Sequence, residues 1–433
     1  MIKIECRVGY NFGLSLPKVK RDIMKTTVKL LLLFLIVASL IAIQSCKEKT
    51  DDPFTGNTYL ISATREVTMT ESNVQTMIST FATAYPEINS IYDDIKNGII
   101  VYSVKYNTTF EGEDIVASGL VVIPDEVGSY PVISFQNGTN TVYSNAPSVN
   151  PLNTLYQMVE CIASEGYVVV IPDYIGFGAS KDIFHPYLHK ESTVKSIVDM
   201  LYSVKEFDED VAKDATFLNE YYLLGYSQGG WATLALLDAL ENDYSSDFAV
   251  KGCCCGAGPY DISYFNSYVL GLTTYPMPSF LAYIAKAYSD HGFFTNPLSD
   301  LFQSSYIASI DNDFDGMHST TQINEALTTS ISTLFKADYI SGYASDSKFQ
   351  SVRDALSANS IEAWNSSVPL LFTHGTDDVY VPPVISVNMH NAMISAGTSS
   401  TTCTYLTISG KDHPGAIVPS CIAGINLFNS LKK

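Results

Sequence analysis

The sequence predicts an α/β protein in which a mostly parallel sheet is flanked by helices on both faces. Apolar runs of buried-strand length alternate with stretches whose apolar residues recur at helical spacing, and this alternation is typical of parallel strands joined by crossover helices. The clearest helical stretch is 191–207, whose apolar face consists of Val194, Ile197, Val198, Leu201 and Val204. The alternation lapses between Asp261 and about Asn359, which is longer than ordinary connections, so we expect an inserted helical cap there.

Eight strands are expected along the chain. The first two are rich in Val, Ile and Tyr and have no helix between them, which predicts an antiparallel pair, whereas several later runs are continuously apolar, as buried parallel strands are. The eight runs are 100–106, 115–123, 131–135, 167–171, 221–226, 248–255, 368–373 and 401–408. The cap, residues 262–358, therefore follows the sixth strand and divides the core into residues 99–261 and 359–433.

The composition is that of a globular protein. Hydrophobic residues make up 46% of the 433 residues and charged residues 16%, which excludes an intrinsically disordered chain. The formal net charge of −20 argues against nucleic acid as a partner, because phosphate repels a protein of this charge. Eight cysteines are too sparse for a disulfide scaffold, although Cys403 and Cys421 could be oxidised to a disulfide in an exported protein.

Residues 1–45 are predicted to be a leader that the working protein lacks. The apolar run 30–43 follows two lysines; it is too short to span a membrane comfortably and has the length of a signal-peptide core. Met24 directly precedes this basic region and is the expected start. The residues after the run, Ile43-Gln44-Ser45-Cys46, resemble the lipobox of bacterial lipoproteins, which implies lipidation of Cys46. The alternative is an ordinary secretory signal with an incidental cysteine.

Removal of the leader changes the charge of the protein. Of the 25 basic and 45 acidic residues, seven and two lie in residues 1–45, so their loss leaves 18 and 43 and a net charge of −25. Anionic lipid repels a body this acidic, so a lipid on Cys46 would have to attach it to the membrane. Residues 46–98 are expected to form a lipid-anchored tether followed by short helices. The predicted location is the outer membrane, on its periplasmic or cell-surface side.

A nucleophilic serine is predicted at the end of the fifth expected strand. There Gly225-Tyr226-Ser227-Gln228-Gly229 forms a G-x-S-x-G motif between a buried strand and a helical stretch. The chemistry requires a serine in a sharp, strained turn, and glycines on both sides let the neighbouring backbones approach. This strand–turn–helix context is therefore typical of a serine that attacks a carbonyl group.

Such a serine needs a histidine base, and His413 is the candidate among seven histidines. It follows the last expected strand in a loop with glycine and proline, where α/β sheets place catalytic groups. His374 directly follows the strand 368–373, whereas His390 lies in a helical stretch and two other histidines fall in the cap. A base C-terminal to both of its partners agrees with the order serine, acid, histidine.

The acid is expected just beyond the strand 368–373. The residues from His374 to Pro382 resemble a pattern of the α/β-hydrolase superfamily, His-Gly-x-x-Asp-x-x-Val-Pro. This resemblance implies that Asp378 is the catalytic acid, and Asp377 is the alternative.

Two further segments, 172–178 and 185–188, make the chain similar to the secreted lipase and esterase branch of this superfamily over about residues 99–433. The resemblance implies an α/β-hydrolase fold whose mostly parallel, eight-stranded sheet is flanked by helices. It also implies a serine carboxylic-ester hydrolase that works through an acyl-enzyme on Ser227 and requires no metal or organic cofactor.

The same resemblance implies an oxyanion hole made of two backbone N–H groups. One belongs to Gln228, the residue after the nucleophile, and the other to the loop 136–140 after the third expected strand. Thr139 is the expected donor and Asn140 the alternative. Many members of the superfamily have His-Gly in this loop, whereas this chain has Asn137 before the glycine.

The expected substrate is a small-molecule, lipid or acylated-carbohydrate ester. Two alternatives retain the fold: an esterase that removes acyl or feruloyl groups from polysaccharide, or a serine peptidase, although no anchor for a peptide terminus is identifiable. A third is a non-catalytic surface-binding protein. The segment 311–316 opens like a calcium-binding loop but has Gln322 where the bidentate glutamate belongs, so no metal site is expected.

Overall fold

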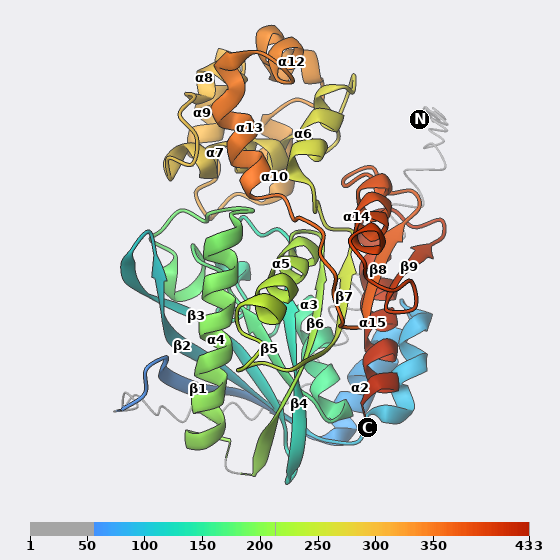
Figure 1. The fold of residues 1–433 in the computed structure, drawn as a ribbon. Coiled ribbons are helices and arrows are strands. Elements are labelled where there is room, and N and C mark those ends of the chain that lie inside the picture. The colour runs from blue at the N-terminus through green and yellow to red at the C-terminus, as the bar shows by residue number, and fades with distance from the viewer. Residues whose placement is uncertain (1–55, 213, 433) are drawn as a thin grey trace, which may run out of the picture. The chain divides into compact units, whose positions relative to one another are not determined.

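The structure, a computed structural model, describes residues 56–212 and 214–432. In this part of the chain a nine-stranded sheet has the order β1-β2-β3-β5-β4-β6-β7-β8-β9 (Figure 1). The pairs β1–β2, β2–β3 and β3–β5 are antiparallel, and all pairs from β5 to β9 are parallel. The strands are β1 (Leu60–Met69), β2 (Ile99–Phe110), β3 (Glu113–Pro124), β4 (Gly128–Gln136), β5 (Val168–Pro172), β6 (Ala215–Tyr226), β7 (Val250–Gly256), β8 (Leu370–Gly375) and β9 (Cys403–Ile408).

The predicted mostly parallel sheet is confirmed, but the predicted number of eight strands is wrong by one. β1 lies in the segment 46–98, where we expected only a tether and short helices. Two register shifts, near Leu60 and Arg65, interrupt its pairing with β2, so its buried residues do not alternate and the strand lacks the usual sequence pattern. Because of β1, the cap follows the seventh strand and not the sixth. The predicted leader and Cys46 lie outside the described residues.

Helices cover both faces of the sheet (Figure 1). On one face lie α4 (Lys190–Asp210), α5 (Gln228–Asn242) and α14 (Pro383–Ser395), and on the other lie α2 (Glu71–Ala82), α3 (Thr154–Glu160), α15 (Ile417–Leu431) and the 3-10 helices η1 (Pro86–Asp94) and η3 (Cys161–Glu165). Side chains of a central strand alternate between these two layers. In β5, Val168 and Val170 belong to the first and Val169 and Ile171 to the second, as the period of two requires.

The segment between β7 and β8 is helical. It contains α6 (Ile262–Leu270), α7 (Pro278–Asp290), α8 (Leu298–Leu301), α9 (Ser304–Asn312), α10 (Thr320–Ala326), α11 (Ile331–Leu334), α12 (Ala337–Gly342), η5 (Ser347–Phe349) and α13 (Gln350–Ala358). Many of its aromatic side chains are buried. Phe265, Tyr283 and Phe294 belong to the same hydrophobic cluster as the residues under α4 and α5. Short 3-10 helices elsewhere are η2 (Tyr143–Asn145), η4 (Gly178–Ser180) and η6 (Pro414–Ala416).

The last helix is unusually apolar. Within the described residues, the stretch Pro414–Leu431 is the one helix long and apolar enough to cross a membrane by composition. In the structure it packs on the sheet as η6 and α15, with Ile425 and Phe428 fully buried. Cys421 on this helix is a free thiol, as is Cys403 on β9, so the structure contains no disulfide between them.

Candidate active site

Ser227 occupies a strained turn between β6 and α5. Its backbone has φ 61° and ψ −124°, a conformation that non-glycine residues rarely adopt. A side chain on Gly225 would overlap the carbonyl of Gly229, and one on Gly229 would overlap the carbonyl of Gln136. The Ser227 N–H donates to the Gly256 carbonyl of β7 at 2.8 Å, which fixes the turn against the sheet. The turn thus presents the hydroxyl beyond the strand end, as the motif predicts.

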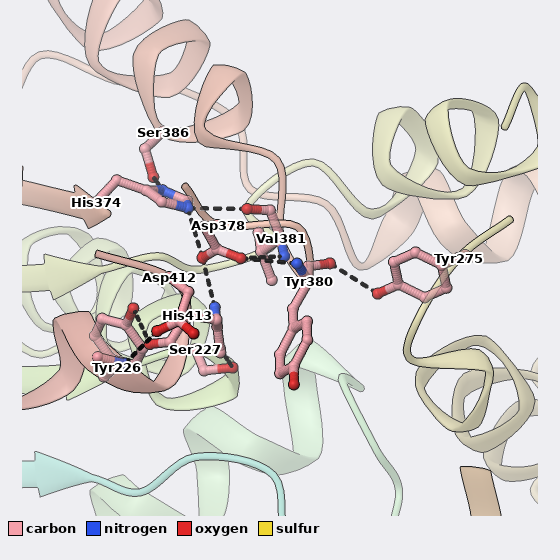
Figure 2. Close-up of polar contacts among 11 residues, drawn as sticks. Tyr226, Ser227, Tyr275, His374, Asp378, Tyr380, Val381, Ser386, Asp412 and His413 are labelled. Atoms are coloured by element: carbon pink, nitrogen blue, oxygen red, sulfur yellow. Dashed lines mark hydrogen bonds and ion pairs between the residues drawn. The ribbon is translucent and has the colours of Figure 1, made fainter. Parts of the chain in front are cut away.

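The imidazole of His413 lies against this hydroxyl. Its Nε2 is 2.8 Å from Ser227 Oγ, and the side chain is buried in the loop between β9 and α15 (Figure 2). The phenol of Tyr226 donates to the His413 carbonyl at 2.8 Å, so the residue before the nucleophile supports the loop that carries the histidine. His413 is therefore the histidine that the structure brings to the predicted serine.

Asp378 lies on the other side of the imidazole. Its Oδ2 is 2.6 Å from His413 Nδ1, while its Oδ1 accepts the backbone N–H groups of Tyr380 at 2.8 Å and Val381 at 2.9 Å (Figure 2). These bonds orient the carboxylate towards the histidine. The alternative acid, Asp377, is exposed, and its backbone N–H bonds to the carbonyl of Lys411, so it does not reach this position.

A second histidine, His374, contacts the same carboxylate. This fully buried side chain belongs to the pattern that indicated Asp378, but nothing in that pattern assigns it a role of its own. Its Nε2 lies 3.0 Å from Asp378 Oδ2 and 2.9 Å from the Val381 carbonyl, and its Nδ1 lies 2.7 Å from Ser386 Oγ. Both neighbours of Nε2 are acceptors, so Nε2 carries a proton.

The environment keeps Asp378 ionised. Burial by itself would raise the pKa of this carboxyl, but hydrogen bonds from His374 and His413 outweigh burial and lower its pKa to about 2. The group therefore stays negatively charged through the neutral and mildly acidic range. A fixed anion beside Nδ1 favours the tautomer of His413 whose Nε2 can accept a proton from the serine.

Gln228, the first predicted oxyanion donor, is the first residue of α5. Its backbone N–H lies in the first turn, where a helix provides no acceptor, and the helix dipole favours negative charge nearby. Its side chain is anchored, because the amide Nε2 lies 2.9 Å from His185 Nε2, while His185 Nδ1 lies 2.6 Å from the Ile175 carbonyl. Burial lowers the pKa of His185 to about 4, so the ring is neutral and accepts the amide proton.

The loop after β4 forms the facing wall. Thr139 lines the same cavity as Ser227, and its hydroxyl is 2.7 Å from the phenol oxygen of Tyr187. Gly138 lies beside Ser227, since a Cβ built on it would be 3.8 Å from Ser227 Cβ. The side chain of Asn140 bonds to the backbone of Val142 at 3.0 Å in both directions and shapes the turn. Thr139 thus lies where a second donor is needed, and its role as donor stays a prediction.

A cavity of about 360 Å³ opens at the hydroxyl of Ser227. The core contributes Phe135, Leu155 and Ile417 to its walls, and the helical segment contributes Met277 and Phe280. That segment is also hydrogen-bonded to the loop after β8, which carries Asp378 and is called the acid loop below. The Tyr275 phenol donates to the Tyr380 carbonyl of this loop at 2.7 Å (Figure 2). Within residues 56–212 and 214–432 no group of three or more His, Cys, Asp or Glu side chains is arranged to hold a metal ion.

The fold is similar to those of several proteins of known structure. The fold is similar to that of a protein described as a hydrolase from Legionella pneumophila, with a TM-score of 0.77, 23% identity, and coverage of 87% of this chain and 98% of that chain. It is also similar to the rice cell wall degrading esterase LipA from Xanthomonas oryzae, with a TM-score of 0.73, 20% identity, and coverage of 87% and 98%. Candida antarctica lipase A aligns with a TM-score of 0.58, 14% identity, and coverage of 88% and 85%.

These likenesses confirm the α/β-hydrolase fold. No curated protein matches the sequence. Residues 151–413, more than half of the chain, match the family described as secretory lipase. The chain therefore belongs to the secretory lipase family, and it is an exported carboxylic-ester hydrolase.

Proposed function

We propose that Ser227, His413 and Asp378 are the nucleophile, base and acid of this ester hydrolase. The observation that supports the proposal is the continuous path from Ser227 Oγ to His413 Nε2 at 2.8 Å and from His413 Nδ1 to Asp378 Oδ2 at 2.6 Å. Oxygen and nitrogen at these distances can exchange the proton that activates the serine.

In the proposed reaction Ser227 Oγ attacks the ester carbonyl and its proton passes to His413 Nε2. Asp378 stabilises the resulting imidazolium, and the N–H groups of Gln228 and Thr139 stabilise the negative oxygen of the tetrahedral intermediate. The C–O bond to the alcohol breaks, and His413 gives its proton to the departing oxygen. Water, deprotonated by the same histidine, then releases the acid from the acyl-enzyme.

A fluorophosphonate probe tests the nucleophile. We expect one covalent adduct on the peptide that contains Ser227, because the probe reacts with a serine that a neighbouring base activates. Peptide mass spectrometry locates the adduct, and an excess of p-nitrophenyl butyrate should slow its formation. A chain that hydrolyses esters but carries the adduct on another serine would contradict the assignment, and a chain that forms none would favour the non-catalytic binding protein.

The alcohol part of the substrate is proposed to be a lipid or an acylated carbohydrate. Comparison of acetylated sugars with acetate esters of simple alcohols separates the two possibilities.

We also propose that the exported protein is anchored by a lipid on Cys46. The support is the lipobox-like sequence that ends at Cys46 and the net charge of −25 that remains without the leader. Replacing Cys46 with serine is expected to move the protein from the detergent phase to the aqueous phase in a Triton X-114 partition, with ester turnover retained. A Cys46→Ser protein that still enters the detergent phase would contradict lipidation at this residue.

A further inference from the structure

A second, smaller pocket lies behind the loop that carries His413. It has a volume of about 40 Å³ and lies where η1, α3 and α15 meet. Ile88 and Ile91 of η1 form one wall, and Val418 and Ile422 of α15 form another. The pocket contains no charged residue, and its remaining walls are also aliphatic side chains, methionine and the thiol of Cys421. Such a lining offers nothing to a polar ligand and suits a hydrocarbon.

This pocket adjoins the catalytic cavity. Leu155 in the first turn of α3 and Ile417 at the start of α15 line both spaces. Neither side chain is fully buried, although their neighbours deeper in the layer are. Ile417 is only four residues beyond His413, so this opening lies beside the catalytic loop. An acyl chain attached to Ser227 would therefore reach the pocket by passing these two apolar side chains.

The helical segment gives the catalytic cavity a wall of a different character. It contributes the apolar Met277 and Phe280 together with the polar Thr320. An ester has two arms, the acyl chain and the alcohol, and they must leave the carbonyl carbon in different directions. The apolar pocket beyond Leu155 and Ile417 fits the acyl chain, and the mixed wall fits the alcohol.

We propose that the acyl chain of the substrate extends from Ser227 past Leu155 and Ile417 into the pocket between η1, α3 and α15. This inference rests on the proposed function, since it requires an acyl group on Ser227. A volume of 40 Å³ holds about three water-sized groups, so the pocket accepts about three methylene groups beyond the catalytic cavity. The enzyme is therefore selective for medium-length acyl chains over short ones.

The test measures kcat/KM for p-nitrophenyl butyrate, octanoate and dodecanoate with the purified exported chain. Each methylene that leaves water favours the longer ester by about fourfold, so octanoate should exceed butyrate by at least about tenfold. Ile422 lies in the pocket and not in the catalytic cavity. Ile422→Trp fills the pocket and should lower the ratio of octanoate to butyrate by at least about tenfold. Ile422→Ala enlarges the pocket and should raise the ratio of dodecanoate to octanoate.

Met277→Trp is the matched control, because it adds the same bulk to the wall of the helical segment. The ratio of octanoate to butyrate should not change in this variant. A ratio that falls in Met277→Trp and is unaffected by both Ile422 variants would place the acyl chain under the helical segment and overturn the inference. If Ile422→Trp does not fold, the ratio of dodecanoate to octanoate in Ile422→Ala still tests the inference, because this ratio should rise. If the unaltered chain does not hydrolyse the butyrate ester, that result would instead contradict the proposed function.

Discussion

Replacing Ser227 with alanine is expected to lower kcat for p-nitrophenyl butyrate by about a million-fold, the loss that removal of a serine nucleophile causes in other triads. Alanine has no oxygen to form the acyl-enzyme, and the residual rate comes only from binding and the oxyanion donors. The fold should persist, because the variant retains the backbone bond from residue 227 to Gly256. Turnover is measured by release of p-nitrophenol and folding by circular dichroism during heating.

Ser79→Ala is the control for the serine substitution. Ser79 is exposed on α2, and its hydroxyl bonds to the carbonyl of Gln75 one turn earlier, far from any group used in the proposed reaction. Wild-type turnover is expected for this variant. A Ser227→Ala protein that folds and hydrolyses the ester at a rate close to that of the Ser79→Ala protein would exclude Ser227 as the nucleophile.

Replacing Asp378 with asparagine should lower kcat about ten-thousand-fold. The amide has the same shape, but it lacks the negative charge that stabilises the imidazolium of His413. His374 and His413 both approach Oδ2 of Asp378, so an amide nitrogen placed there would face two N–H groups. In the opposite orientation the amide nitrogen would replace Oδ1 and would face the backbone N–H groups that now donate to it. Either orientation disturbs the tautomer of His413 that the reaction needs.

Asp377→Asn tests the specificity of that loss, because it makes the same change one residue earlier on an exposed side chain. This variant should retain wild-type turnover. A large loss in Asp377→Asn together with a small loss in Asp378→Asn would make Asp377 the acid and contradict the geometry of the loop. Equal small losses would indicate that His413 works without a carboxylate partner.

The sequence could bring the proposed serine, histidine and acid together because each lies shortly after a strand. Residues that follow the carboxyl ends of parallel strands meet at one edge of the sheet, whatever their separation along the chain. Ser227, Asp378 and His413 follow β6, β8 and β9 in this way. The choice between Asp377 and Asp378 depended on the resemblance, since a two-residue pattern does not show which side chain points inward.

Other features could not be predicted because they depend on contacts between distant segments. His374 and Ser386 are brought together by the packing of α14 on β8, and neither residue alone indicates a role for the other. β1 could not be predicted because its bulges remove the alternation of buried and exposed residues by which a strand is recognised. The direction of a backbone N–H in the loop after β4, on which the choice of Thr139 rests, depends on dihedral angles that a sequence does not specify.

The bond between Tyr275 and the acid loop limits how the helical segment could be exchanged by protein engineers. The Tyr380 carbonyl accepts a hydrogen bond from the Tyr275 hydroxyl, and the Tyr380 N–H donates to Asp378. The backbone of one residue therefore contacts both the helical segment and the Asp378 carboxylate. Segments that cover an active site are attractive for transplantation between related enzymes, because they are treated as substrate-selecting modules. A chimera with a foreign segment here would need a donor at the position of Tyr275, or its turnover would suffer together with its selectivity.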